Sequence, residues 1–120
     1  MTQARGPRFD LEERTFEFAR RVRRFVKGLP RTVSKLEDVK QLVRASGSVG
    51  ANYIEANEAL GQKDFRMHLR ICKKETKELR YFLRLLDTGE EKTLDAERDE
   101  LIQETKELTN IFSAILKKSD

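Results

Sequence analysis

A repeat of core-forming residues at alternating steps of four and three positions constrains this chain more than any other feature. It is unbroken between residues 65 and 86, where its members are Phe65, Leu69, Cys72, Thr76, Leu79, Leu83 and Leu86. Residues three and four apart share one face of an α-helix, whereas a half-buried strand alternates at every second residue. The repeat therefore predicts a helix over residues 64–87, with Asp64 as its N-cap residue and Gly89 beyond its end.

Three further segments show the same period and predict three more helices. They cover residues 10–28, 34–60 and 94–117. The first two begin with capping-box spacing, Asp10 with Glu13 and Ser34 with Glu37, and Gly61 is expected to end the second. The predicted core positions of the first helix are Leu11, Thr15, Phe18, Val22, Phe25 and Leu29. Those of the second are Leu36, Val39, either Val43 or Leu42, Ser46, either Val49 or Gly50, Tyr53 and Leu60. Those of the fourth are Leu101, Thr105, Leu108, Phe112 and Ile115.

Four helices joined by short connections predict a single all-α domain over residues 1–120. Sequential helices then pack as antiparallel neighbours, which gives an up-down-up-down four-helix bundle. Apolar residues off the core lines either widen the buried stripes or form a second face for oligomerisation. They are Phe16, Ile54, Phe82, Leu85, Ile102 and Ile111.

Composition narrows the class of protein. Of the 120 residues, 38% are charged and 38% are apolar, and no run approaches the roughly 18 apolar residues of a membrane span. The N-terminus, MTQARGPRFD, has no apolar segment of the kind found in secretory signals. Cys72 has no second cysteine with which to form an intrachain disulfide. Together these features predict a cytoplasmic protein.

Charge is segregated along the chain. Residues 1–86 hold 20 Lys and Arg against 11 Asp and Glu, a net charge of +9, whereas residues 87–120 hold 5 against 10, a net charge of −5. Six basic residues of the third helix recur at steps of four and three. They are Arg66, Arg70, Lys73, Lys77, Arg80 and Arg84, and we call them the basic stripe. The stripe lies about 100° around the helix from the core line and could follow a phosphate backbone.

The first helix carries a shorter basic line. It consists of Arg20, Arg24, Lys27 and Arg31. If the two lines lie on neighbouring helices, they form a nucleic-acid surface whose affinity depends on salt. Alternatively, the basic stripe is a solvated face, neutralised by Glu75 and Glu78 or by the acidic fourth helix. Only Tyr81 and Phe82 lie near the basic residues, which favours backbone binding over base-specific readout.

Residues that could support catalysis or metal binding are few. His68 and Cys72 lie four positions apart, but Cys72 is on the core line and is better explained as a buried thiol. The other candidates are Glu55, Glu58, Glu75 and Glu78. Di-metal sites in bundles also use a Glu-x-x-His motif, which the chain lacks. The sequence therefore predicts no enzyme activity, no metal and no cofactor, and Glu55 and Glu78 are expected to bond across helices.

The segment from Ser46 to Leu60 departs from ordinary helix composition. It contains two glycines, two serines and two asparagines, although each glycine costs a helix interior about 1 kcal/mol relative to alanine. Small residues let helix backbones approach closely, and Asn52 or Asn57 can bond a neighbouring helix. We interpret the segment as a packing seam rather than a ligand site.

The same segment carries a family resemblance. Residues 48–59, SVGANYIEANEA, resemble the signature of the four helix bundle protein family, whose founding members are encoded by intervening sequences inside bacterial 23S rRNA genes. Further matching motifs are Lys63-Asp64-Phe65, residues 74–78, residues 81–86, Glu107-Leu108 and Ile111-Phe112, within residues 9–118. The signature and packing positions are Ser48, Asn52, Glu55, Asn57, Glu58, Glu75 and Glu78.

The resemblance implies a left-handed antiparallel bundle that assembles into a ring, typically a homopentamer, without enzyme activity. A related branch serves as the accessory protein of diversity-generating retroelements, where a basic pentameric barrel binds nucleic acid and a reverse transcriptase. This chain has Lys74-Glu75 where that branch carries Gly-Ser, and Asn57 where many relatives have Gly. We expect a homo-oligomer that binds RNA or DNA, or alternatively a protein-interaction scaffold.

Overall fold

The protein folds into four α-helices, as the sequence predicts. The computed structural model describes the backbone of residues 7–119 and the side chains of residues 10–32 and 35–119. The helices are α1 (Pro7–Lys27), α2 (Val33–Asn57), α3 (Gln62–Leu85) and α4 (Lys92–Lys118). No strand occurs in the described part of the chain, so the fold is all-α. None of the helices found there is both long and apolar enough to cross a membrane.

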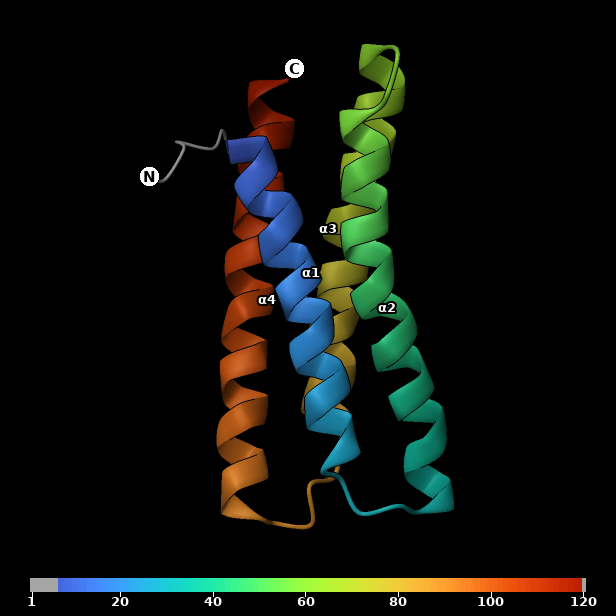
Figure 1. Ribbon diagram of the computed structural model, residues 1–120, viewed down its shortest axis with the longest axis vertical. Helices are drawn as coiled ribbons and strands as arrows, with labels where there is room; N and C mark the ends of the chain where they lie inside the picture. The colour runs from blue at the N-terminus through green and yellow to red at the C-terminus, as the bar shows by residue number, and fades with distance from the viewer. Residues whose placement is uncertain (1–6, 120) are drawn as a thin grey trace, which may run out of the picture.

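The helices form an up-down-up-down bundle. α2 packs between α1 and α3, and α4 packs against α3 and α1. The α1–α2 and α3–α4 connections lie at one end of the bundle and the α2–α3 connection at the other (Figure 1). α1 and α3 are consequently diagonal to each other.

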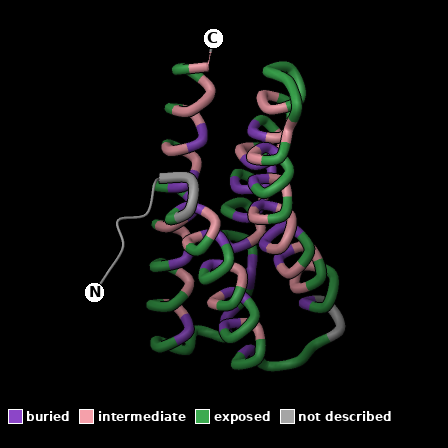
Figure 2. The backbone as a smooth tube through the Cα atoms, turned by 45° about the horizontal axis from the view of Figure 1, so that its top comes forward, coloured by how far each residue is buried: buried purple, intermediate pink, exposed green. Residues whose placement is uncertain are grey.

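One apolar core runs along the bundle. Figure 2 shows buried positions recurring along each helix. The largest inaccessible side chains include Phe18, Phe25, Leu42, Leu69, Leu79, Leu83, Leu108 and Phe112. The predicted core lines of the first, third and fourth helices are buried, except for Phe65 and Ile115, which pack half-buried against the edge of the core.

The predicted core line of the second helix is partly wrong. Leu42, and not Val43, is buried, while Leu36 is 52% exposed and Leu60 is fully exposed. Leu60 lies beyond the end of α2, where the helical period no longer applies. Steps of three and four backwards from Leu42 lead to Val39 and Lys35, so Leu36 falls one position off the buried line.

The first two helices begin earlier than predicted. α1 begins at Pro7, upstream of Asp10. Proline suits the first turn of a helix because the N–H groups there have no intrahelical acceptor, so its lack of an N–H loses no hydrogen bond. α2 begins at Val33, so the spacing of Ser34 and Glu37 does not mark its start. The Ser34 side chain itself lies outside the described residues.

The turn between α2 and α3 also differs from the prediction. α2 ends at Asn57, and Gly61 is the extended N-cap residue of α3 rather than the stop signal of α2. Asp64 therefore lies inside the first turn of α3. α4 begins two residues early because the Glu91 side chain accepts hydrogen bonds from the next turn, including 3.0 Å from the backbone N–H of Leu94.

The small-residue segment of α2 contains one close contact with α1. A Cβ atom on Gly50 would lie 3.1 Å from Thr15 Oγ1, whereas one on Gly47 would meet only Arg23 Nη2, at 3.5 Å. The Thr15 hydroxyl donates to two carbonyl oxygens of its preceding turn, at 2.9 and 3.0 Å, so rotating it away would break these bonds. Close helix approach is thus a property of Gly50 rather than of the whole segment.

This difference predicts opposite responses to two alanine substitutions in one helix. Gly47→Ala should raise the free energy of unfolding by about 0.5–1 kcal/mol, because alanine is the better helix former and its methyl group has room. Gly50→Ala should give no gain or a loss, because its methyl group presses on Thr15. Urea denaturation at two protein concentrations measures both and separates folding from any assembly effect. An equal gain from both substitutions would contradict the close contact.

Candidate nucleic-acid interface

Five of the six residues of the basic stripe have no acidic partner. Within the part of the chain that the structure describes, no carboxylate oxygen lies within 4.0 Å of the cationic nitrogens of these five residues. They are Arg70, Lys73, Lys77, Arg80 and Arg84. All are exposed except Lys73, which is half-buried. Cations that no neighbour neutralises retain their attraction for a bound anion.

The sixth residue, Arg66, has a structural role. Its Nη1 atom donates to the carbonyl oxygen of Leu116 at 2.9 Å and to Ser119 Oγ at 2.7 Å. The last carbonyl groups of a helix lack intrahelical donors and lie at the negative end of its dipole. Arg66 therefore caps the C-terminus of α4. Unlike the other five residues of the stripe, it is not available to bind a ligand.

The glutamates expected to neutralise the stripe are paired with α2 instead. Glu75 has a side chain only 5% exposed, and its carboxylate lies 2.7 Å from Arg44 Nη1. The neighbouring Glu78 carboxylate lies 3.7 Å from Arg44 Nη2. A buried carboxylate requires such a partner because its desolvation is costly. The interpretation that Glu75 and Glu78 neutralise the stripe is therefore wrong.

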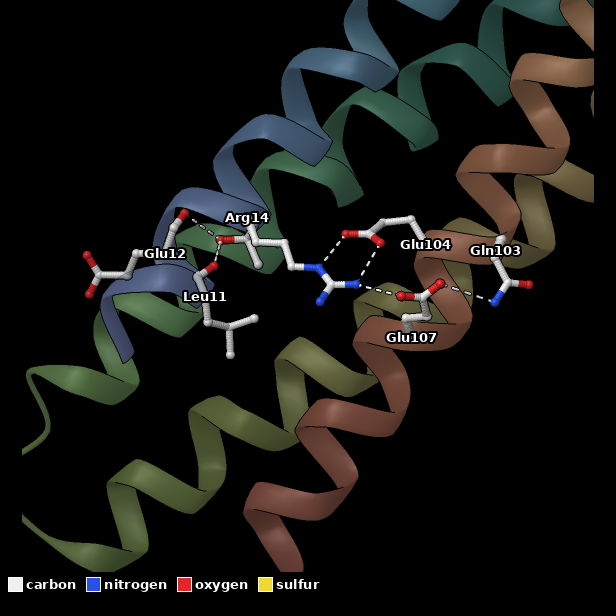
Figure 3. A network of polar contacts seen from close by, with 7 residues as sticks. Leu11, Glu12, Arg14, Gln103, Glu104 and Glu107 are labelled. Carbon is white, nitrogen blue, oxygen red and sulfur yellow. Dashed lines mark hydrogen bonds and ion pairs between the residues drawn. The ribbon is translucent and has the colours of Figure 1, made fainter. Parts of the chain in front are cut away.

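The acidic side of α4 faces α1. Arg14 donates to both carboxylate oxygens of Glu104 at 2.8 Å and to Glu107 at 2.9 Å (Figure 3). The hydrogen bond with Glu104 is the main cause that raises the pKa of Arg14. Hydrogen bonds from Gln103 and then from Arg14 lower the pKa of Glu107. These α4 carboxylates thus neutralise α1 rather than the basic stripe.

The unpaired cations line two adjoining grooves on the α3–α4 side. One groove, of about 460 Å³, is lined by Lys77, Arg80, Tyr81 and Arg84 of α3 with Lys106 and Asn110 of α4. The other, of about 570 Å³, is lined by Arg70, Lys73, Lys74, Lys77 and Tyr81 of α3, with Glu78 and Leu116 at its side. Because Lys77 and Tyr81 line both, we treat them as one basic groove.

Sequence reasoning missed the α4 wall of this groove. Lys106 and Asn110 lie four positions apart and so share a helix face. The net negative charge of residues 87–120 concealed Lys106, because a charge count along the chain does not resolve the faces of a helix. The i, i+4 spacing could have suggested a common face, but not that this face borders α3.

The basic line of the first helix does not join the basic groove. α1 and α3 are diagonal in the bundle, so the expectation of two neighbouring basic lines is wrong. Arg20 and Arg24 lie 2.8 and 4.0 Å from the carboxylate of Glu17. Lys27 and Arg31 line a separate, mainly apolar groove beside the α1–α2 connection.

Two asparagines of the signature segment join α2 to its neighbours. Asn52 Oδ1 lies 3.1 Å from His68 Nδ1 of α3, and Asn52 Nδ2 donates to the carbonyl oxygen of Ser48 at 2.9 Å. Asn57 Nδ2 donates to Glu12 of α1 at 2.8 Å. The two amides therefore make the cross-helix contacts that the packing interpretation requires.

The residues considered for nucleophilic catalysis are directed to different partners. His68 contacts Asn52 and lies 3.4 Å from Asp64 Oδ1 through its Nε2 atom. Cys72 is buried, and its thiol donates to the carbonyl oxygen of Val49 at 3.4 Å. Burial raises the pKa of the Cys72 thiol to about 12, so very little of the reactive thiolate exists near neutral pH.

The four candidate glutamates also remain apart. Glu55 is exposed on α2 and Glu58 is exposed just beyond its end, whereas Glu75 and Glu78 share Arg44. Glu78 thus forms the expected cross-helix ion pair, and no such bond is found for Glu55 among the described residues. Over those residues, no group of three or more His, Cys, Asp or Glu side chains is placed to hold a metal ion.

Comparisons with known proteins agree with this architecture. The family model of the 23S rRNA-intervening sequence protein matches residues 8–114. The crystal structure of a protein of unknown function from the S23 ribosomal protein family of Bacteroides thetaiotaomicron is similar, with 28% identity and a TM-score of 0.76. That similarity covers 92% of this chain and 97% of the other. No match was found among curated proteins.

The environment of Cys72 predicts a thiol that does not react in the native protein. Because the thiol is buried and its pKa is raised to about 12, a disulfide reagent such as dithionitrobenzoate should label it only as the chain unfolds. Labelling should follow the urea unfolding curve measured by circular dichroism. Rapid labelling of the folded protein at pH 8 would instead reveal an accessible, activated thiol.

Proposed function

The chain belongs to the 23S rRNA-intervening sequence protein family, and we propose that it is a non-enzymatic protein that binds the phosphate backbone of RNA or DNA. The observation that carries this proposal is the basic groove, where six cations of α3 and Lys106 of α4 have no carboxylate partner among the described residues. The candidate nucleophile and carboxylates do not converge, which favours binding over chemistry.

The groove suits a polyanion better than a small anion. From Arg70 to Arg84 it follows α3 for about 21 Å, at ~1.5 Å per residue. Its cations succeed one another along the helix instead of converging on one point. Each phosphate that a cation neutralises releases condensed counterions, so binding should weaken steeply with salt and depend little on base sequence.

We also propose that the protein assembles into a homo-oligomer, with a pentamer as the state that the family resemblance suggests. The α1–α2 face supports self-association, because Phe16 and Ile54 are 56% and 50% exposed beside a shallow groove. Gly47 and Ala51 help to line that groove of about 360 Å³, and their small size lets another helix approach closely. This face lies opposite the α3–α4 side of the bundle.

A protein-interaction scaffold is the second candidate function. A groove of about 680 Å³ beside the α1–α2 connection is lined by Val26, Leu29, Leu36 and Val39. Leu36 is 52% exposed there, and exposed apolar patches rimmed by polar residues are typical of protein-binding surfaces. This alternative predicts a stable oligomer whose interactions are unaffected by nucleic acid.

Charge reversal in the basic groove tests nucleic-acid binding. Lys77→Glu combined with Arg80→Glu should weaken binding of a mixed-sequence RNA by at least about tenfold, and should reduce the salt slope by roughly 0.7 for each lost phosphate contact. Fluorescence anisotropy across a series from about 50 to 200 mM salt measures both. Both residues are exposed, so circular dichroism should show an unchanged fold.

The matched control places the same charge change elsewhere. Arg24→Glu combined with Lys40→Glu also lowers the net charge from +4 to 0, at exposed positions of α1 and α2. It should retain most of the binding if the groove, rather than net charge, holds the ligand. Salt-insensitive binding, or none at about 50 mM salt, would reject the proposed function.

The α1–α2 face generates a prediction about assembly. Phe16→Glu combined with Ile54→Glu should dissociate the oligomer, because assembly would bury charged carboxylates in place of apolar side chains. Tyr81→Glu combined with Leu85→Glu, at similarly exposed apolar residues of α3, should leave the oligomer intact. Sedimentation velocity reports both. If the unsubstituted protein is monomeric, the assembly proposal is wrong.

A further inference from the structure

Tyr81 occupies the junction of the basic groove. It lines both parts of the groove together with Lys77, and it is 58% exposed. Lys77 precedes it by four positions and Arg84 follows it by three, so all three side chains share one face of α3. The sequence alone did not predict that Tyr81 lies among the basic residues, because it falls one position off the basic stripe.

The Tyr81 ring is supported from one direction. It meets the Phe82 ring edge to face, with 5.5 Å between ring centroids and 82° between planes. Phe82 is itself half-buried and packed against the core, so its contact restricts the position of the Tyr81 ring. Tyr81 itself is 58% exposed, so much of its side chain is accessible to a ligand.

An exposed tyrosine is common on protein surfaces, and alone it indicates no ligand. Here the ring lies among the unpaired cations of α3, opposite Lys106 and Asn110 of α4. Asn110 is exposed, and its amide could meet the edge of a base. Cations for phosphates beside an aromatic face for a base are the two elements of a single-strand binding site.

Resting on the proposed function of the same groove, we propose that it binds single-stranded rather than double-stranded nucleic acid, with an unpaired base stacked on Tyr81. In a duplex both faces of a base are already stacked on neighbouring bases. The Tyr81 ring could therefore stack on a base only if the duplex were first unstacked. A single strand can turn a base outward at little cost.

The phosphates on either side of the stacked base would then meet cations on both sides of Tyr81. Lys77 lies on the Arg70 side of Tyr81, and Arg84 lies on the other side. Lys106 provides a third cation from the opposite wall. Backbone and base are thus bound by different side chains, which allows their contributions to be measured separately.

The test compares Tyr81→Leu with Tyr81→Phe in the 120-residue chain. A 12-nucleotide RNA strand of mixed sequence, a DNA strand of the same sequence and the corresponding RNA duplex are titrated by anisotropy at one salt concentration. Tyr81→Leu keeps an apolar side chain but removes the aromatic face, and should weaken binding of both single strands by about 5- to 100-fold. Tyr81→Phe should retain their binding, and neither change should weaken binding of the duplex.

Intrinsic fluorescence provides an independent readout. The chain has no tryptophan and two tyrosines, and Tyr53 is buried in the core. Stacking of a base on Tyr81 should quench the exposed part of the emission when a single strand binds. The duplex should leave the emission unchanged, and Tyr81→Phe should abolish the quenching while retaining affinity.

The outcomes separate this inference from the function on which it rests. If Tyr81→Leu leaves strand affinity unchanged, or weakens strand and duplex equally, the stacking inference is wrong. Loss of binding after reversal of Lys77 and Arg80 would still support the backbone function in that case. If neither strand nor duplex binds the parent protein, the proposed function fails and the inference falls with it.

Discussion

The ion pair between Arg44 of α2 and Glu75 of α3 determines which charges on α3 remain free. Glu75 is almost inaccessible, and its carboxylate is stable there because Arg44 approaches to 2.7 Å. Arg44 also reaches Glu78, at 3.7 Å. Two acidic residues of α3 are therefore directed toward α2, and the basic side chains on the α4 side keep their charge without compensation.

The four interfaces between neighbouring helices differ in chemistry. The α2–α3 and α4–α1 interfaces contain ion pairs, such as those of Arg44 and Arg14. The α1–α2 groove is small and apolar, with Phe16 and Ile54 at its rim. The α3–α4 groove is basic and lies on the opposite side of the bundle. By itself, assembly through the α1–α2 face would leave the basic groove accessible to a ligand.

The accuracy of the sequence predictions follows the strength of the local pattern. The core lines of the first, third and fourth helices are well predicted, because large apolar residues and threonines recur there without interruption. The second helix is less regular. Adjacent apolar residues left Leu42 and Val43 undecided, and Leu36 was placed inside although the buried line passes through Lys35. Helix ends were missed where Pro7 and Gly61 act through backbone conformation.

The sequence by itself determined the number and order of the helices, their antiparallel packing and the burial of Cys72, because periodicity and short connections are local properties of the chain. Only the tertiary structure decided which charges are neutralised. That outcome depends on how each helix is rotated about its axis, which the packing of the whole core sets. This rotation turned Glu75 toward Arg44 and Glu104 toward Arg14. It also left Lys77, Tyr81 and Lys106 together in one groove, although the sequence separates α3 from α4 and gives α4 a net negative charge.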